Sequence, residues 1–409
     1  MSAAGVLRGR LLCPRPAEAR VDEIADGLVR FDAAGQITAV EPAGDSEVPE
    51  TFPGAVLLPG FVDAHVHFPQ TRVLGSASGP LLPWLARSVF PEEAKFAARA
   101  YAAAVAVEFC DALIRQGTTC AAIYSSSHPV AADALFAALA ERGLRGLAGL
   151  TLMDRGAPAD VLLAADEAIA ACERLIERWH GHDGRLQFCV TPRFALSCTP
   201  GLLRAAGQLA ERHGLAVQTH LAENSAEITA TTAAFPDARD YLAVYEDHGL
   251  GGSRALFAHC IHLSEGAWDR VAAQDAAVAH CPDSNFFLGS GCMPLMAASG
   301  RGIRIGLGTD VGAGRSFSLR QIMAAGYDAS LIVGAPASAE ALLWHATRGG
   351  ARALGLGGAI GCLAPGFAAD VVAIDVPAEA SGSALFDALA FRRDAGPVRA
   401  TMVRGRALR

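Results

Sequence analysis

Short apolar runs alternate with longer amphipathic stretches through the middle of the 409-residue chain. Each apolar run has the length of a strand and ends in polar residues, and helical periodicity separates most of the runs. The eight runs occupy residues 60–68, 117–126, 144–154, 185–194, 215–223, 254–263, 276–285 and 304–312. The helical stretches include residues 131–143, 160–178, 202–212 and 265–273, and further helices are predicted between 317 and 356. Eight strands that alternate with helices predict an α/β fold, a (β/α)8 TIM barrel.

The two ends of the chain show a different pattern, in which short segments alternate apolar and polar residues. Examples are residues 27–31 and 35–40 near the start, and 370–375 and 400–405 near the end. Neither end can bury a core alone. We therefore expect residues 1–58 and 362–409 to combine into one small β-sandwich domain beside a barrel formed by residues 59–361. Two frayed terminal extensions are the alternative.

The composition narrows the range of partners. The chain is 52% hydrophobic and 19% charged, with a formal net charge of -8 and no basic run, so no nucleic-acid partner is expected. No uncharged apolar stretch has the length of a membrane span, and no signal-like apolar segment follows the first residues, so no membrane partner is expected. The ten cysteines form no CxxC pair, and several lie in the apolar runs. This pattern favours buried, reduced thiols and a cytoplasmic location.

Two histidines lie two residues apart at the end of the first apolar run. In a strand, His65 and His67 point to the same face, which in a barrel is the interior, near the strand ends where active sites form. A single buried histidine is typically a hydrogen-bonded core residue, but two imidazoles on one buried face would repel each other when protonated. Because a shared metal ion would remove this conflict, the pair predicts a metal site.

Polar residues at the ends of three later runs can complete this site. His220 lies near the end of the fifth run and His259 in the sixth, while Asp310 follows the eighth. The predicted metal ligands are His65, His67, His220 and Asp310, a donor set that suits Zn2+, with Fe2+ as second choice. Such a metal lowers the pKa of its bound water to about 7. The sequence leaves two roles for His259. It is either a direct metal ligand or a hydrogen-bonding partner of the attacking water and the developing oxyanion.

Glu223 lies three residues after His220, where the fifth strand passes into a loop. A carboxylate there is predicted to act as the general acid and base that moves protons between the water and the substrate. The alternative is a carboxylate that only stabilises the first turn of the next helix.

These residues belong to longer segments that resemble the metal-dependent amidohydrolase superfamily over nearly the whole chain, and within it the guanine deaminase family. The HxH pair alone marks only the superfamily, whereas the letters FPQT, PRF and HLAEN point to the guanine deaminase branch. The most specific segments are residues 59–70 (PGFVDAHVHFPQ), 190–194 (VTPRF), 218–224 (QTHLAEN), 281–291 (CPDSNFFLGSG) and 306–314 (GLGTDVGAG).

The resemblance implies a zinc-dependent aminohydrolase that converts guanine to xanthine and ammonia in purine catabolism, acting as a cytoplasmic homodimer. It implies that Glu223, His259 and Asp310 are catalytic and repeats the four metal ligands given above. It further implies that a purine contacts residues on two of these segments. These residues are Gln70, Arg193 and Phe194, and Trp84 is expected to add a wall. A planar, uncharged ring needs an aromatic surface and a few fixed donors and acceptors, which these side chains offer.

The count of lysines bears on the number of metals. Of the 34 basic residues only Lys95 is a lysine. Two-metal members of this barrel class bridge their metals with a carboxylated lysine on the fourth strand, and the run 185–194 has none. One metal per chain is therefore predicted.

The sequence also departs from the family pattern. Residues 76–80 read SASGP where the family has a stretch like Ala-Tyr-Gly-Glu-Gln, and Leu150 stands where a lysine is usual. The first change lies near the predicted substrate loop, so it leaves the choice of purine open. The nearest alternative is a mononuclear aminohydrolase or chlorohydrolase that acts on another purine, a pterin or a triazine. A two-metal hydrolase of cyclic amides is a further alternative. A catalytically inactive barrel that serves as an oligomeric interaction protein belongs to a different class and would be expected to lack the metal ligands.

Overall fold

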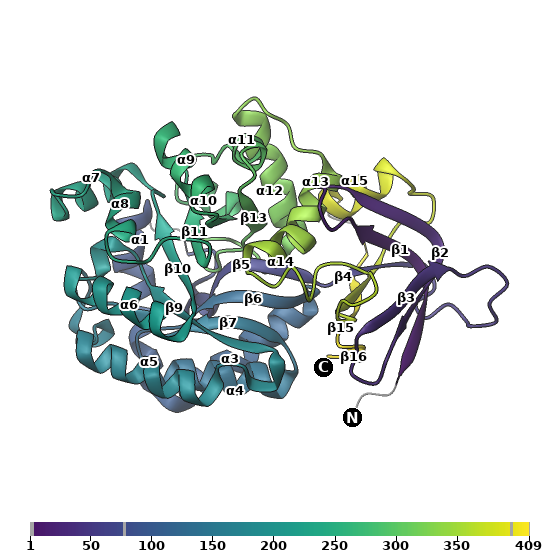
Figure 1. Ribbon diagram of the computed structural model, residues 1–409, viewed down its shortest axis with the longest axis horizontal. Coiled ribbons are helices and arrows are strands. Elements are labelled where there is room, and N and C mark those ends of the chain that lie inside the picture. The colour runs from purple at the N-terminus through teal and green to yellow at the C-terminus, as the bar shows by residue number, and fades with distance from the viewer. Residues whose placement is uncertain (1–3, 77–78, 393–395, 409) are drawn as a thin grey trace.

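A barrel forms the larger, left-hand part of the computed structural model in Figure 1. The structure describes residues 4–76, 79–392 and 396–408. The eight strands of the barrel run parallel, each paired with the next. They are β5 (Phe61–His67), β6 (Thr118–Tyr124), β7 (Arg145–Gly149), β9 (Leu186–Pro192), β10 (Ala216–Leu221), β11 (Ala255–His259), β12 (Ala277–His280) and β13 (Arg304–Leu307), with the short β8 (Thr151–Leu152) extending the pairing to β9. The ring closes where Asp310 N–H donates to the His65 carbonyl and His67 N–H to the Val311 carbonyl. The predicted fold class is confirmed.

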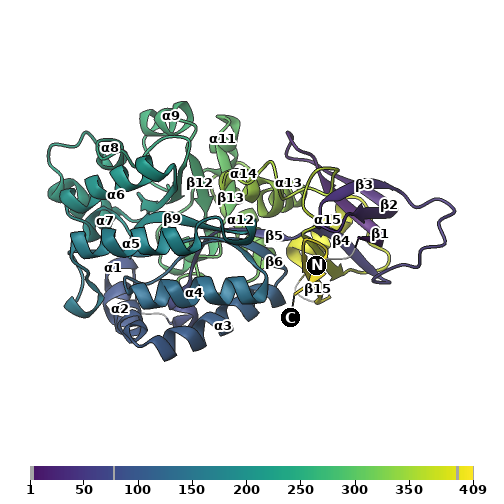
Figure 2. The same ribbon diagram turned by 60° about the horizontal axis from the view of Figure 1, so that its bottom comes forward.

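Helices surround the strands (Figures 1 and 2). The predicted helical stretches form α4 (Pro129–Arg142), α5 (Ala165–Trp179), α6 (Pro200–His213) and α9 (Glu265–Ala273). The ring is completed by α3 (Arg99–Arg115), α12 (Leu319–Ile332), α13 (Ala339–Trp344) and α14 (Gly350–Ala353). Local sequence fixes several of their ends. Helix α6 begins after Thr199, whose hydroxyl accepts from Leu202 N–H, and ends at Gly214, whose φ of 65° suits glycine.

The seventh apolar run ends earlier than predicted. Strand β12 stops at His280 instead of continuing to residue 285, because Pro282 opens the short helix α10 (Pro282–Phe287). A proline lacks the N–H that a strand needs and is well placed in a first helical turn. Three further helices lie in segments that the apolar pattern left unassigned. They are α7 (Ser225–Ala234), α8 (Tyr241–Glu246) and α11 (Leu295–Gly300).

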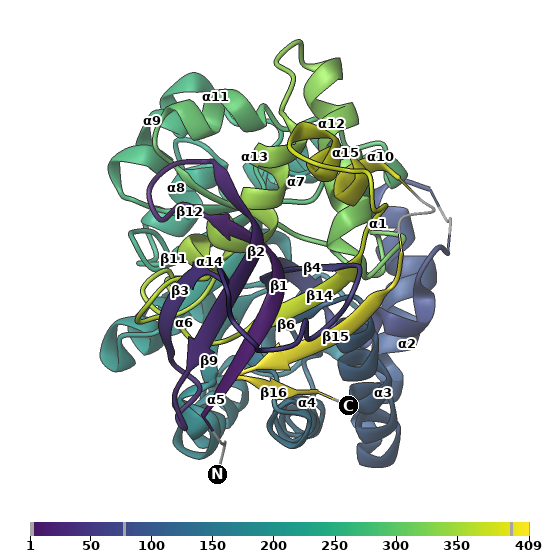
Figure 3. The ribbon, with the colours of Figure 1, turned by 90° about the vertical axis from the view of Figure 1, so that its right-hand side faces the viewer.

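Strands from both chain ends share one seven-stranded sheet beside the barrel, in which purple and yellow strands lie side by side (Figure 3). The order is β16-β15-β14-β4-β1-β2-β3, and only the β1–β4 pair is parallel. The strands are β1 (Gly5–Pro14), β2 (Val21–Phe31), β3 (Ile37–Pro42), β4 (Ala55–Pro59), β14 (Val371–Asp375), β15 (Val398–Val403) and β16 (Arg406–Ala407). A helix not foreseen in this region, α15 (Ser383–Phe391), separates β14 from β15. The division into domains at residues 58 and 362 stays a prediction.

A buried ion pair joins the sheet to the barrel. Arg145, at the start of β7, donates to Asp370, just before β14, with an Nε–Oδ2 distance of 2.5 Å. Both side chains are less than a tenth exposed. Among the described residues, no helix is long and apolar enough to cross a membrane.

Candidate active site

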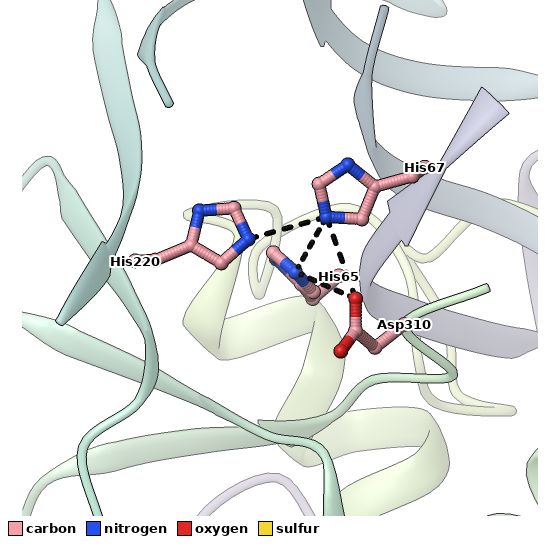
Figure 4. Close-up of side chains that lie close together, drawn as sticks. All are labelled: His65, His67, His220 and Asp310. Atoms are coloured by element: carbon pink, nitrogen blue, oxygen red, sulfur yellow. Dashed lines mark hydrogen bonds and ion pairs between the residues drawn. The ribbon is translucent and has the colours of Figure 1, made fainter. Parts of the chain in front are cut away.

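Three imidazoles and one carboxylate converge at the C-terminal ends of three barrel strands (Figure 4). His67 Nε2 lies 3.2 Å from both His65 Nε2 and His220 Nε2. Asp310 Oδ1 lies 3.3 Å from His65 Nε2 and 3.4 Å from His67 Nε2. Strand β5 supplies two of the histidines, β10 supplies His220, and Asp310 follows β13. The spacing of two in β5 therefore brings both imidazoles to one point, as the sequence predicts.

The electrostatics of this cluster favour a bound cation. Burial lowers the pKa of His65, His67 and His220, so the three rings are neutral and can each offer a lone pair. His220 Nδ1 lies 2.5 Å from the carbonyl oxygen of Arg193, which can only accept, so this nitrogen carries the proton and Nε2 carries the lone pair. Burial by itself raises the pKa of Asp310, but the hydrogen bond with His65 and the electrostatic influence of the neighbouring imidazoles outweigh it, and the pKa falls to about 2. Converging lone pairs and a permanent carboxylate form a donor set that fits a divalent metal.

The backbone that carries this cluster is held in an unusual conformation. Ala222, His259 and Asp310 have positive φ values of 50°, 70° and 48°. Such values are rare for residues other than glycine and cost free energy, so they persist only where neighbouring contacts impose them. The buried Asp63 supplies one such contact, since its carboxylate accepts from both the N–H and the hydroxyl of Thr309, next to Asp310.

A second pair of titratable groups lies beside the cluster. Glu223 Oε2 is 3.5 Å from His259 Nε2, which is itself 3.8 Å from Asp310 Oδ2. Burial raises the pKa of Glu223 to about 7, although the nearby His259 charge opposes this rise. Burial by itself lowers the pKa of His259, but the charges of Glu223 and Asp310 outweigh it and raise the pKa. A carboxyl group with a pKa near 7 can both accept and release a proton at neutral pH.

A pocket opens directly onto these groups. It is lined by His67, His220, Glu223 and Asp310 on one side, and by Gln70, Arg193, Trp84, Phe194, Leu81, Leu85, Leu288 and Ala313 on the others. Trp84 lies in the short helix α1 (Leu81–Trp84), and its indole N–H donates to the Ser76 carbonyl. The pocket therefore combines aromatic and aliphatic walls with two polar side chains, the composition expected for a flat small molecule.

Comparison with known proteins identifies the family. A model of the amidohydrolase family matches residues 56–408. The chain belongs to the amidohydrolase family. It is 45% identical over 323 residues to the probable guanine deaminase of Deinococcus radiodurans. The aligned region covers 78% of this chain and 73% of that protein.

Two solved structures share the fold of this amidohydrolase over its whole length. The guanine deaminase of Escherichia coli superposes with a TM-score of 0.93 at 34% identity and covers 99% of both chains. A guanine deaminase from C. acetobutylicum with bound guanine in its active site has a TM-score of 0.92 at 27% identity, covering 99% of this chain and 100% of the other. The predicted resemblance to the superfamily and to its guanine deaminase branch is thus confirmed.

All the predicted site residues of this amidohydrolase lie together. The four predicted ligands form the cluster, and the four predicted substrate-binding residues line the pocket. His259 faces Glu223 and Asp310 and lies outside the four-residue cluster. The altered segment 76–80 includes Ala77 and Ser78, which lie outside the described residues. The roles assigned to these residues stay predictions.

Three buried contacts were not anticipated from the sequence. Asn285 Oδ1 lies 2.9 Å from His259 Nδ1, and Ser290 donates to Glu223 Oε1 over 3.4 Å. Both residues belong to the segment 281–291, whose family resemblance was the only available signal. The third contact joins the buried Glu93 to Arg193 Nη1 over 2.7 Å. Glu93 lies 100 positions away in the chain, and no sequence pattern linked the two.

Proposed function

We propose that this amidohydrolase hydrolyses guanine to xanthine and ammonia. The observation that carries the proposal is the juxtaposition of the His65, His67, His220 and Asp310 cluster with a pocket that has aromatic walls and only two polar side chains beyond the cluster and Glu223. The guanine deaminases to which the chain is similar support the choice of substrate. The four clustered residues would hold one zinc ion per chain, with Fe2+ as the second choice. When bound, zinc supplies a water molecule that is nucleophilic at neutral pH.

The chain's own residues would manage the protons. The oxygen of water adds to the ring carbon that bears the amino group, and Glu223 accepts a proton at its carboxylate. Glu223 then delivers that proton to the amino nitrogen, the carbon–nitrogen bond breaks and ammonia leaves. The new hydroxyl group becomes the oxo group of xanthine as its proton moves to a ring nitrogen. The pKa of about 7 suits Glu223 to both transfers.

His259 and the pocket walls would position the reacting groups. His259 Nε2 faces Glu223 and Asp310, where it can donate to the oxygen that adds to the ring. Phe194 and Trp84 would pack against the faces or edges of the purine. Arg193 and Gln70 would bind polar atoms of the ring and orient its amino-bearing carbon toward Glu223.

Ammonia release from the zinc-loaded protein tests the proposal. Guanine is compared with adenine, a pterin and an aminated triazine at equal concentration. We expect guanine to be deaminated with the highest kcat/KM. A protein that leaves guanine untouched but deaminates another of these compounds would contradict the substrate and leave the mechanism standing. Light scattering of the purified protein tests the expected homodimer, and metal analysis tests the ratio of one ion per chain.

A further inference from the structure

A single buried carboxylate lies behind the two polar side chains of the pocket. Glu93 ends the short helix α2 (Phe90–Glu93), is 1% exposed and lies outside the pocket lining. One of its oxygens accepts from Arg193 Nη1 over 2.7 Å, and the other accepts from Gln70 Nε2 over 3.4 Å. Glu93 therefore holds Arg193 and Gln70 from behind, whereas a ligand in the pocket would meet them from the front.

The amide of Gln70 is fixed in one orientation by two neighbours of opposite character. Gly312 N–H can only donate, and it lies 3.0 Å from Gln70 Oε1. The Glu93 carboxylate, when ionised, can only accept, and it faces Gln70 Nε2. The amide oxygen is thus turned to the backbone, and the second hydrogen of the NH2 group is left for the pocket. A side chain at position 312 would disturb this arrangement, because a Cβ there would lie only 2.7 Å from the backbone carbonyl oxygen of Gln70.

The guanidinium of Arg193 is held in the same way. Its Nη1 is directed to Glu93 and to the sulfur of Met153, 3.6 Å away, and its Cζ lies 5.4 Å from the centre of the Phe90 ring. A guanidinium carries five N–H groups, so donors remain for a ligand in the pocket. The negative charge of Glu93 also balances the positive charge of Arg193. A pocket wall without net charge suits an uncharged ring better than a carboxylate substrate.

We propose that Glu93 is a positioning residue that makes this wall of the pocket a row of donors and so selects a purine edge made of acceptors. The inference rests on the proposed function. Guanine presents two acceptors, O6 and N7, on one edge, whereas an amino group at position 6 presents a donor there. Donors held by a buried carboxylate cannot turn to accept from that amino group. A purine with oxygen at position 6 is therefore preferred over one with nitrogen.

The test compares guanine with 2,6-diaminopurine, which keeps the amino group at position 2. It carries an amino group in place of the oxygen at position 6, and its N1 therefore has no hydrogen. In the Glu93→Gln variant, the new side chain has one oxygen and one NH2 group. Its NH2 group must face either Gln70 or Arg193, so one donor is displaced. We expect kcat/KM for guanine to fall about 10- to 100-fold, mainly through KM, and the guanine-to-diaminopurine ratio to fall at least about 10-fold.

Glu92→Gln provides the matched control. Glu92 lies in the same helix, is also buried and also pairs with a cation, Lys95, but its carboxylate accepts from Lys95 and Tyr101 instead of from Gln70 and Arg193. We expect this variant to stay within about threefold of the unmodified protein for both substrates. Metal content and thermal midpoint are measured for every variant. Glu93→Asp keeps the charge and cannot reach both partners, so it replaces Glu93→Gln if the latter does not fold.

The outcomes separate this inference from the proposed function. An unchanged guanine-to-diaminopurine ratio in the Glu93 variants, or an equal fall for both substrates, would overturn the role of Glu93. Xanthine binding by calorimetry is measured alongside, and we expect it to weaken about 10-fold or more in the Glu93 variant. If the unmodified protein binds xanthine but does not deaminate guanine, the proposed function fails, and the xanthine affinities still decide the role of Glu93. Binding of neither purine overturns both.

Discussion

Replacing Glu223 by glutamine is expected to remove activity and to stabilise the metal-free protein. The exchange preserves the shape of the side chain and leaves the four clustered ligands intact. It removes the carboxylate that lies 3.5 Å from His259 Nε2 and does not belong to the cluster. Loss of a positioned general acid and base typically lowers kcat by about 100- to 10,000-fold. We expect a fall in that range, with metal content unchanged.

The gain in stability follows from the pKa of Glu223. Burial raises it from the ordinary value of 4.5 to about 7. The folded protein then binds a proton more tightly than the unfolded chain, so stability decreases as the pH rises from 4.5 to 7 and stays lowered above 7. At pH 8 the ionised carboxylate costs about 3 kcal/mol, and at pH 5 it costs about 1 kcal/mol. Glutamine removes this cost.

Urea unfolding of protein dialysed against a chelator measures the effect. The glutamine variant is expected to be more stable than the unmodified protein by about 3 kcal/mol at pH 8 and by only about 1 kcal/mol at pH 5. The comparison at pH 5 serves as the internal control, because packing changes would appear at both pH values. A variant that is less stable at pH 8, or that keeps a tenth or more of the activity, would refute the assignment of Glu223 as a buried proton shuttle.

Three further predictions concern the cluster, a buried histidine and the link between barrel and sheet. Asp310→Asn removes the charged ligand, so the zinc-to-protein ratio measured by elemental analysis should fall well below that of the unmodified protein, and retained zinc would contradict the ligand assignment. Burial lowers the pKa of His280 to about 3. Below pH 6.5 the unfolded chain therefore binds a proton at this histidine before the folded protein does, and the metal-free protein loses stability as the pH falls. In urea unfolding at pH 5, His280→Asn should reduce this loss by about 2 kcal/mol. Arg145→Met leaves the Asp370 carboxylate buried without its charged partner. It should lower the free energy of unfolding by about 3–5 kcal/mol in the same assay at pH 7. A decrease of less than about 1 kcal/mol would show that the pair does not hold the sheet to the barrel.

The fold of this amidohydrolase was readable because its hydrophobic pattern is local. Strand-length apolar runs and amphipathic helices each carry their own periodicity, and the recurrence of the two predicts a barrel without knowledge of any distant contact. The ends of the elements were less certain, since β12 was predicted to run to residue 285 and ends at His280. There, Pro282 favours a helix over a strand.

The cluster of His65, His67, His220 and Asp310 was also predictable, because strands that are far apart in the chain lie close together in a barrel. Residues at the ends of β5, β10 and β13 are far apart in the chain, but the carboxyl ends of parallel strands in a barrel meet at one face. The residue types at those ends therefore indicated a shared site. The substrate-binding residues depended on the family resemblance, since a strand-end arginine such as Arg193 has no local signal that separates it from a surface residue.

The sequence by itself determined the barrel, the joining of both chain ends beside it, and the four residues of the cluster. Only the tertiary structure decided how those residues are held. The contact of Glu93 with Arg193 and Gln70, and the raised pKa of Glu223, arise from burial and from neighbours distant in the chain. Periodicity specifies which face of an element is buried, whereas the hydrogen-bond partner of a buried polar group depends on which other elements pack against it.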